Sequence, residues 1–144
     1  MPDPNLDAAA LAHELRIAVM RFSRRLRSQR VDTSVTLTHL SALSTLRRHG
    51  AMSAGELAAH ERVQPPSMTR VVGALEAMEL ITRTPHPTDG RQVVIELTPA
   101  AHDLLDAEAK AREAWLSGRI EQLGARERQI LEEAATIMDK LAAE

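Results

Sequence analysis

The stretch His86–Thr98, HPTDGRQVVIELT, predicts a small β-hairpin inside a chain that otherwise has helical patterns. Asp89-Gly90 lies between an extended run interrupted by prolines and a run of alternating apolar residues, which is a strong short-range hairpin signal. Pro85 and Pro87 have no backbone N–H and cannot donate the hydrogen bonds of a central strand. The strand that precedes Asp89 therefore belongs at the edge of a sheet. We therefore expect an isolated two-stranded ribbon with an exposed tip, and Arg91 lies at that tip.

Three helices are predicted between residue 36 and this hairpin. The segment TLTHLSALSTLRRH (36–49) has leucines at helical spacing and is followed by Gly50, a typical helix stop. Ser53 and Glu56 have the spacing of a capping box, which begins a short helix ending near residue 61. Pro65 begins the third helix, because proline is tolerated in a first helical turn, where its missing N–H has no helical partner.

The third helix has one apolar face and one polar face. At 100° per residue the apolar side contains Met68, Val71, Val72, Leu75 and Met78. The opposite side contains Pro66, Arg70, Gly73 and Ala77. Two helices joined by a short turn, with the second presenting a polar face, form a helix-turn-helix. In this motif the second helix can enter the major groove of DNA. The following ribbon makes the arrangement winged, and its tip can place Arg91 in a narrow, electronegative minor groove.

Composition limits the alternatives for the rest of the chain. The 144 residues fit one compact domain with helical extensions, and the only aromatic residues are Phe22 and Trp115. A core with so few aromatic side chains must be built from aliphatic residues, which suits helix packing better than a β-sandwich. The absence of cysteine excludes a disulfide scaffold, a thiolate metal site and a thiol redox switch in this chain. Amphipathic helices are expected over 7–30, from 99 to about 116, and after Gly124.

Charge and hydropathy indicate where a partner could bind. The net charge is −2, residues 33–98 hold six arginines and six acids, and the acid excess lies after residue 98. An anionic partner is therefore expected on the first two thirds of the chain. The run RFSRRLRSQR (21–30) is either a solvated face or a phosphate-facing surface. Neither a signal peptide nor an apolar stretch of about 18 residues is found, so we expect a soluble cytoplasmic protein with no membrane partner.

Residues 53–101, SAGELAAHERVQPPSMTRVVGALEAMELITRTPHPTDGRQVVIELTPAA, resemble the core of the MarR-type winged helix-turn-helix regulators. The resemblance rests on a Ser/Thr-rich recognition helix, Leu-Glu ahead of the ribbon, Asp-x-Arg at the wing and Leu-Thr before a long helix. It extends over nearly the whole chain. It implies an N-terminal dimerisation helix (1–32), a winged helix-turn-helix DNA-binding lobe (33–98) and C-terminal dimerisation helices (99–144), in a mainly α fold with one small β-ribbon.

The resemblance further implies a homodimer that binds a pseudo-palindromic operator in double-stranded DNA, most often as a repressor. It places the stretch 64–70 on the major groove, Arg91 in the minor groove, and Asp89 in a salt bridge that fixes the wing. Glu79 stands where the family commonly has glycine. The residues expected to contact DNA are Ser53, Gln64, Pro66, Ser67, Thr69, Arg70, Arg83, Asp89, Gly90 and Arg91.

Members of this family commonly release DNA when a small anionic or phenolic ligand binds between the two lobes. The candidate lining residues for such an effector are Arg16, Met20, Phe22, His39 and Trp115, although methionines and aromatics at helical spacing more often belong to ordinary core. The histidines show no His-Glu-x-x-His motif, so no metal site and no cofactor are expected.

Two other classes of protein are alternatives to a DNA-binding regulator. A winged-helix protein-interaction module is the alternative, and the balanced charge of residues 33–98 favours it. An enzyme is not expected, because the sequence has no nucleophile elbow, phosphate loop or pair of carboxylates in a plausible cleft.

Overall fold

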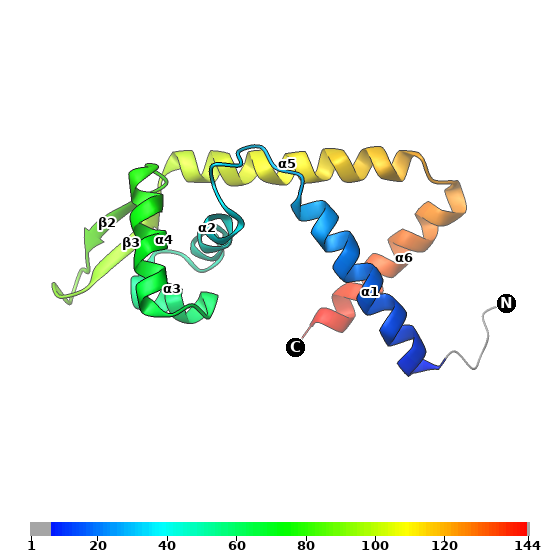
Figure 1. The fold of residues 1–144 in the computed structure, drawn as a ribbon, viewed down its shortest axis with the longest axis horizontal. Helices are drawn as coiled ribbons and strands as arrows, with labels where there is room; N and C mark the ends of the chain where they lie inside the picture. The colour runs from blue at the N-terminus through cyan, green and yellow to red at the C-terminus, as the bar shows by residue number, and fades with distance from the viewer. Residues whose placement is uncertain (1–6, 144) are drawn as a thin grey trace. The chain divides into compact units, whose positions relative to one another are not determined.

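A computed structural model describes residues 7–143 and confirms the mainly α, winged helix-turn-helix fold (Figure 1). The elements are α1 (Ala8–Arg27), α2 (Leu37–His49), β1 (Met52–Ser53), α3 (Ala54–Glu61), α4 (Pro65–Ala77), β2 (Ile81–Pro85), β3 (Val93–Leu97), α5 (Pro99–Glu121) and α6 (Ala125–Ala142). The chain divides into a winged unit, residues 31–109, and a helical unit, residues 1–30 with 110–144. Residues 1–6 and 144 of the predicted dimerisation segments lie outside the described residues.

The helix boundaries in the winged unit follow the predicted signals. Gly50 ends α2 with φ 86° and donates its N–H to the carbonyl of Leu46 at 2.9 Å. Ser53 caps α3, because its Oγ accepts the N–H of Glu56 at 3.1 Å. Pro65 is the first residue of α4, where it costs no hydrogen bond. These local signals therefore set where α2 ends and where α3 and α4 begin.

The sheet contains one strand more than predicted. Its order is β1-β3-β2, and all pairs are antiparallel. Met52 in β1 is opposite Ile95 in β3, and both side chains are buried. A strand of two residues is too short to show alternation in sequence, so the predicted two-stranded ribbon was wrong in this respect.

The core of the winged unit joins its helices to the sheet. Leu43, Leu57, Met68, Leu75 and Ile95, from α2, α3, α4 and β3, are fully buried. The predicted apolar face of α4 is confirmed, because Met68, Val72 and Leu75 are buried, and Val71 and Met78 are partly buried against the core. The recognition helix is therefore positioned by its apolar face, which leaves the opposite face in solvent.

The first part of α5, through residue 109, packs within the winged unit, although the sequence-based division assigns it to the C-terminal helices. Leu105 joins the core, and Arg47 of α2 binds Asp106 of α5 with 2.6 Å between Nη2 and Oδ1. Buried Glu108 accepts the backbone N–H of Val31 at 3.2 Å through Oε1. These contacts hold the start of α5 against the winged unit.

The helical unit leaves many apolar side chains of α1 and α6 exposed to solvent. No residue described in α1 or α6 is buried. The exposed large apolar residues of these two helices are Leu11, Leu15, Val19, Met20, Phe22, Ile130, Leu131, Ile137, Met138 and Leu141. The apolar sides of α1 and α6 are therefore uncovered within one chain. No helix among the described residues is long and apolar enough to cross a membrane.

Candidate nucleic-acid interface

The exposed side of α4 combines a helix start with polar side chains. Gln64, Pro66, Ser67 and Arg70 are exposed, and Gln64 makes no side-chain cap hydrogen bond. The first N–H to bond within the helix is that of Met68, which donates to the carbonyl of Gln64 at 3.1 Å. Because Pro65 and Pro66 have no N–H, Ser67 carries the donors of this helix start that remain available to an anion.

The two predicted hydroxyl contacts of α4 differ in their hydrogen bonding. Thr69 donates its hydroxyl proton to the carbonyl of Pro65 at 3.0 Å. No side-chain hydrogen bond is found for Ser67 among residues 7–143. Ser67 is consequently the better phosphate donor, whereas the hydroxyl oxygen of Thr69 is left to accept from a base amino group.

Ser53 has a structural role in addition to any contact with DNA. It is half-buried, it pairs with Val94 across the sheet, and its Oγ caps α3. A capping oxygen accepts one hydrogen bond but keeps its own proton, which can be donated outward.

The wing loop, residues 86–92, is longer than the tight turn that Asp89-Gly90 suggests. Gly90 is not among the glycines with positive φ, which a two-residue type I′ turn would require. Instead the Nδ1 of His86 accepts the N–H of Thr88 at 3.2 Å and that of Asp89 at 3.1 Å. The N–H of His86 donates to the carbonyl of Gln92 at 2.9 Å. His86, which the sequence analysis did not identify, thus organises the loop.

The tip of the wing presents one arginine to solvent. The side chain of Arg91 is exposed, and its backbone N–H donates to Oδ1 of Asp89 at 3.1 Å. No ion pair of Asp89 is found in the described part of the chain, so the expected salt bridge is replaced by this backbone contact. In Figure 1 the hairpin of β2 and β3 projects past α4 with its loop at the free end.

Gly90 has room for a larger side chain. An added Cβ would have no heavy atom within 4 Å, and its φ is not positive. We expect Gly90→Ala to leave the free energy of unfolding unchanged or raise it by about 0.4–1 kcal/mol, because alanine restricts the unfolded chain. Thermal denaturation followed by circular dichroism measures this. A loss of DNA affinity without a loss of stability would indicate close approach of DNA at Gly90, whereas destabilisation would contradict the observed loop.

Arg83, predicted to contact DNA, is held in an ion pair with a residue that the sequence analysis did not identify. Its Nε lies 2.9 Å from Oε2 of Glu76. This contact joins β2 to the last turn of α4. A side-chain pair between elements that meet only in three dimensions leaves no signal in sequence spacing.

The residues predicted to line an effector pocket belong to both units. In the winged unit, Nδ1 of His39 accepts the N–H of Thr36 at 3.2 Å and completes the cap of α2. In the helical unit, Nη1 of Arg16 lies 3.7 Å from the sulfur of Met20. The ring centroids of Phe22 and Trp115 are 6.2 Å apart. His39 therefore has a clear local role as a capping residue.

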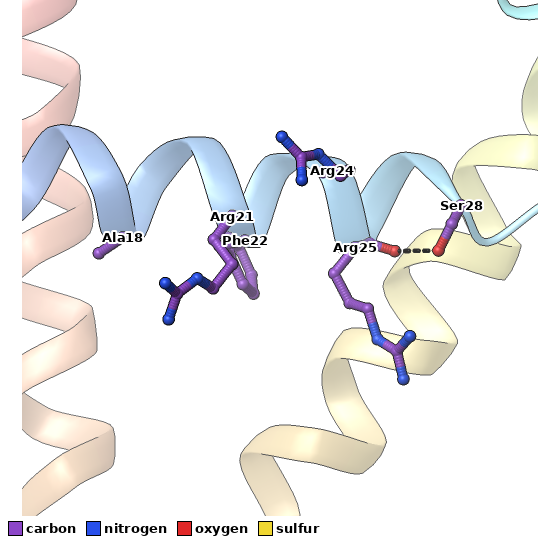
Figure 2. A pocket seen from close by; sticks show the side chains of 6 residues that line it. All are labelled: Ala18, Arg21, Phe22, Arg24, Arg25 and Ser28. Atoms are coloured by element: carbon purple, nitrogen blue, oxygen red, sulfur yellow. Dashed lines mark hydrogen bonds between the residues drawn. The ribbon is translucent and has the colours of Figure 1, made fainter.

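Two hollows lie in the helical unit. One, of about 670 Å³, is lined by residues of α1 and by Ser28, which directly follows this helix. Figure 2 shows Arg21 and Arg25 on one side of the helix, with Arg24 pointing away from them. The other, of about 570 Å³, is mainly apolar and is lined from α1, α5 and α6. Among residues 7–143, no three His, Asp or Glu side chains gather as metal ligands.

Comparisons with known proteins agree with this geometry. The family model described as MarR family matches residues 35–93. An HTH-type transcriptional regulator of Mycobacterium tuberculosis is 48% identical over 130 residues, covering 90% of this chain and 91% of that protein. The HTH-type transcriptional repressor NicR of Pseudomonas putida is 35% identical over 97 residues, covering 67% of this chain and 61% of that protein. A crystal structure from Pseudomonas aeruginosa matches with a TM-score of 0.84 and 28% identity, covering 98% of this chain and 99% of that one.

Proposed function

The chain belongs to the MarR family of DNA-binding transcriptional regulators, which are not enzymes, and from this premise we propose that it represses transcription as a homodimer on a pseudo-palindromic operator. The observation that carries the proposal is the pairing of an exposed, polar α4 face with a projecting wing that presents Arg91. Repression is favoured by the likeness to NicR, which is named a repressor. Contact with chromosomal DNA also implies a cytoplasmic location.

The proposed contacts divide between two grooves. Gln64, Pro66 and Thr69 face the major groove with Arg70, which is long enough to reach base edges. Ser53 and Ser67 donate to phosphates, which position the protein without reading sequence. In the wing, Asp89 orients the backbone, Gly90 allows close approach, and Arg91 enters the minor groove, where narrow A·T-rich stretches attract a guanidinium.

The proposed dimer is supported by the uncovered apolar surface of α1 and α6. Ten large apolar side chains are exposed on the described parts of these two helices, and such exposure is typical of an interaction site. A two-fold dimer would place two copies of α4 about 34–36 Å apart, which matches successive major grooves. A second copy of the chain therefore accounts both for the apolar surface and for the need to read two half-sites.

Ile137→Glu is expected to convert the dimer to monomers, because it places a charge on the apolar side of α6, where Ile137 is 58% exposed within one chain. Thr136→Glu adds the same charge on the other side of the helix and should leave the dimer intact. Analytical ultracentrifugation of both variants measures the change. A dimeric Ile137→Glu protein with wild-type association would remove α6 from the interface.

Release by a small-molecule effector is part of the proposal, with Arg16, Met20 and Trp115 of the helical unit as residues that would line its site. An indole ring and a guanidinium suit an aromatic or anionic ligand. The release can be measured as displacement of the protein from operator DNA when aromatic or anionic compounds are added.

A titration of labelled DNA tests the proposed function. Fluorescence anisotropy compares DNA from upstream of the protein's own gene with a scrambled duplex at several salt concentrations. A saturable preference that weakens with salt is expected, because neutralised phosphates release counterions. No preference for any duplex, including those from a genome-wide binding selection, would favour the alternative of a protein-interaction module.

A further inference from the structure

The ion pair between Glu76 and Arg83 lies where a free cation would affect DNA binding. Glu76 belongs to α4 and Arg83 to β2, the two elements that carry the proposed major-groove and wing contacts. The Arg83 side chain is 38% exposed and the Glu76 side chain 46% exposed, so both charges are open to solvent. Phosphates near this surface would meet a neutralised pair instead of a guanidinium.

The pair is not needed to hold α4 against β2. Leu75 at the end of α4 and Ile81 at the start of β2 are both buried in the core and fix the two elements there. An exposed ion pair contributes only about 0–1 kcal/mol to folding. The consequence of the pair is therefore to be sought in the electrostatics of the surface.

An unpaired Arg83 would attract any phosphate within reach, whatever the base sequence. On operator DNA the wing is already held by Arg91, so an added phosphate contact is constrained by that geometry. On other sequences Arg91 has no preferred groove, and a free Arg83 could hold the wing by itself. Such a contact would favour non-specific DNA more than the operator.

We propose that Glu76 is a specificity-determining residue for DNA binding, because it engages Arg83 and prevents the base of the wing from acting as a sequence-independent phosphate contact. This inference rests on the proposed function. It revises the prediction from sequence that Arg83 itself contacts DNA. Arg91 is then the wing arginine that is available to DNA.

Glu76→Gln tests the proposal, because it frees Arg83 with little change in shape. On scrambled duplex, we expect affinity to rise by about three- to ten-fold and the slope of log K against log salt to steepen by about 0.9 for each added phosphate contact. Affinity for the operator should rise less, so the ratio of operator to scrambled affinity falls. Fluorescence anisotropy over a salt series measures both quantities.

Two further variants separate a freed arginine from a general change in charge. Glu79→Gln removes the same charge from a nearby exposed residue that has no ion pair in the described part of the chain, and it should not steepen the salt slope. Glu76→Gln combined with Arg83→Gln should lose the gain of the single variant.

The inference is overturned if Glu76→Gln leaves scrambled-duplex affinity and salt slope unchanged, or if the double variant keeps the gain. If Glu76→Gln lowered the affinity for both duplexes equally, the ion pair would have a structural role, and the inference would also be overturned. Failure of the wild-type protein to prefer any duplex would instead overturn the proposed function, so the two failures are distinguishable.

Discussion

Arg91→Ala is expected to weaken operator binding by about 10- to 100-fold, because an arginine that reads DNA is worth about 1–3 kcal/mol. The side chain of Arg91 is exposed, and only its backbone N–H is used by Asp89, so truncation removes no internal side-chain contact. Helix content and dimerisation should therefore remain at wild-type levels. Anisotropy titration of operator DNA measures the loss, with circular dichroism as the check on folding.

Arg126→Ala is the matched control for this charge change. Arg126 is exposed on α6 in the helical unit, so its removal lowers the net charge equally without altering the wing. A general electrostatic effect would weaken both variants alike. Wild-type operator affinity in a folded Arg91→Ala protein would remove the wing tip from the mechanism.

Leu43→Ala is expected to cause a large loss of stability. Leu43 in α2 is 0% exposed, so truncation leaves a cavity in the core of the winged unit. Substitutions of this kind cost about 2–5 kcal/mol, which corresponds to a fall in Tm of about 5–20 °C. Thermal denaturation measures the fall, and DNA binding should be lost at temperatures where the variant is unfolded.

Leu37→Ala provides the comparison within the same helix. Leu37 is 49% exposed at the start of α2, so the same chemical change should cost much less than in the core. Equal destabilisation by the two variants would contradict the observed packing of α2.

The helices of the winged unit could be predicted because their boundaries depend on local chemistry. Gly50, Ser53 and Pro65 each act on backbone groups within a few residues. Burial of Met68, Val72 and Leu75 likewise follows from helical periodicity alone. These features need no knowledge of the rest of the fold.

The features that could not be predicted depend on contacts across the fold or on side-chain conformation. β1 exists because two residues pair with β3, and the Glu76–Arg83 pair exists because α4 meets β2. The wing loop departs from a tight turn because the ring of His86 satisfies its backbone.

Glu79 shows a third limit of sequence reasoning. Its φ is 58°, so the backbone directly after α4 is left-handed at Glu79. It adopts this conformation although the residue is not glycine. Strain at this position is tolerated because Thr98 donates its hydroxyl to the Glu79 carbonyl at 2.8 Å and Leu80 is buried next to it. A substituted glycine therefore does not by itself signal a changed backbone.

Hydroxyl-radical footprinting of the wild-type protein on a duplex selected from a random library tests whether a dimer reads DNA with α4 and the wing, because this probe reports access to the minor groove. We expect two protected minor-groove segments related by two-fold symmetry, flanking half-sites whose centres are about 10 base pairs apart. We also expect Arg91→Ala to lose this protection first. A single unsymmetrical protected segment, or no protection at saturating protein, would contradict a dimer that reads DNA with α4 and the wing.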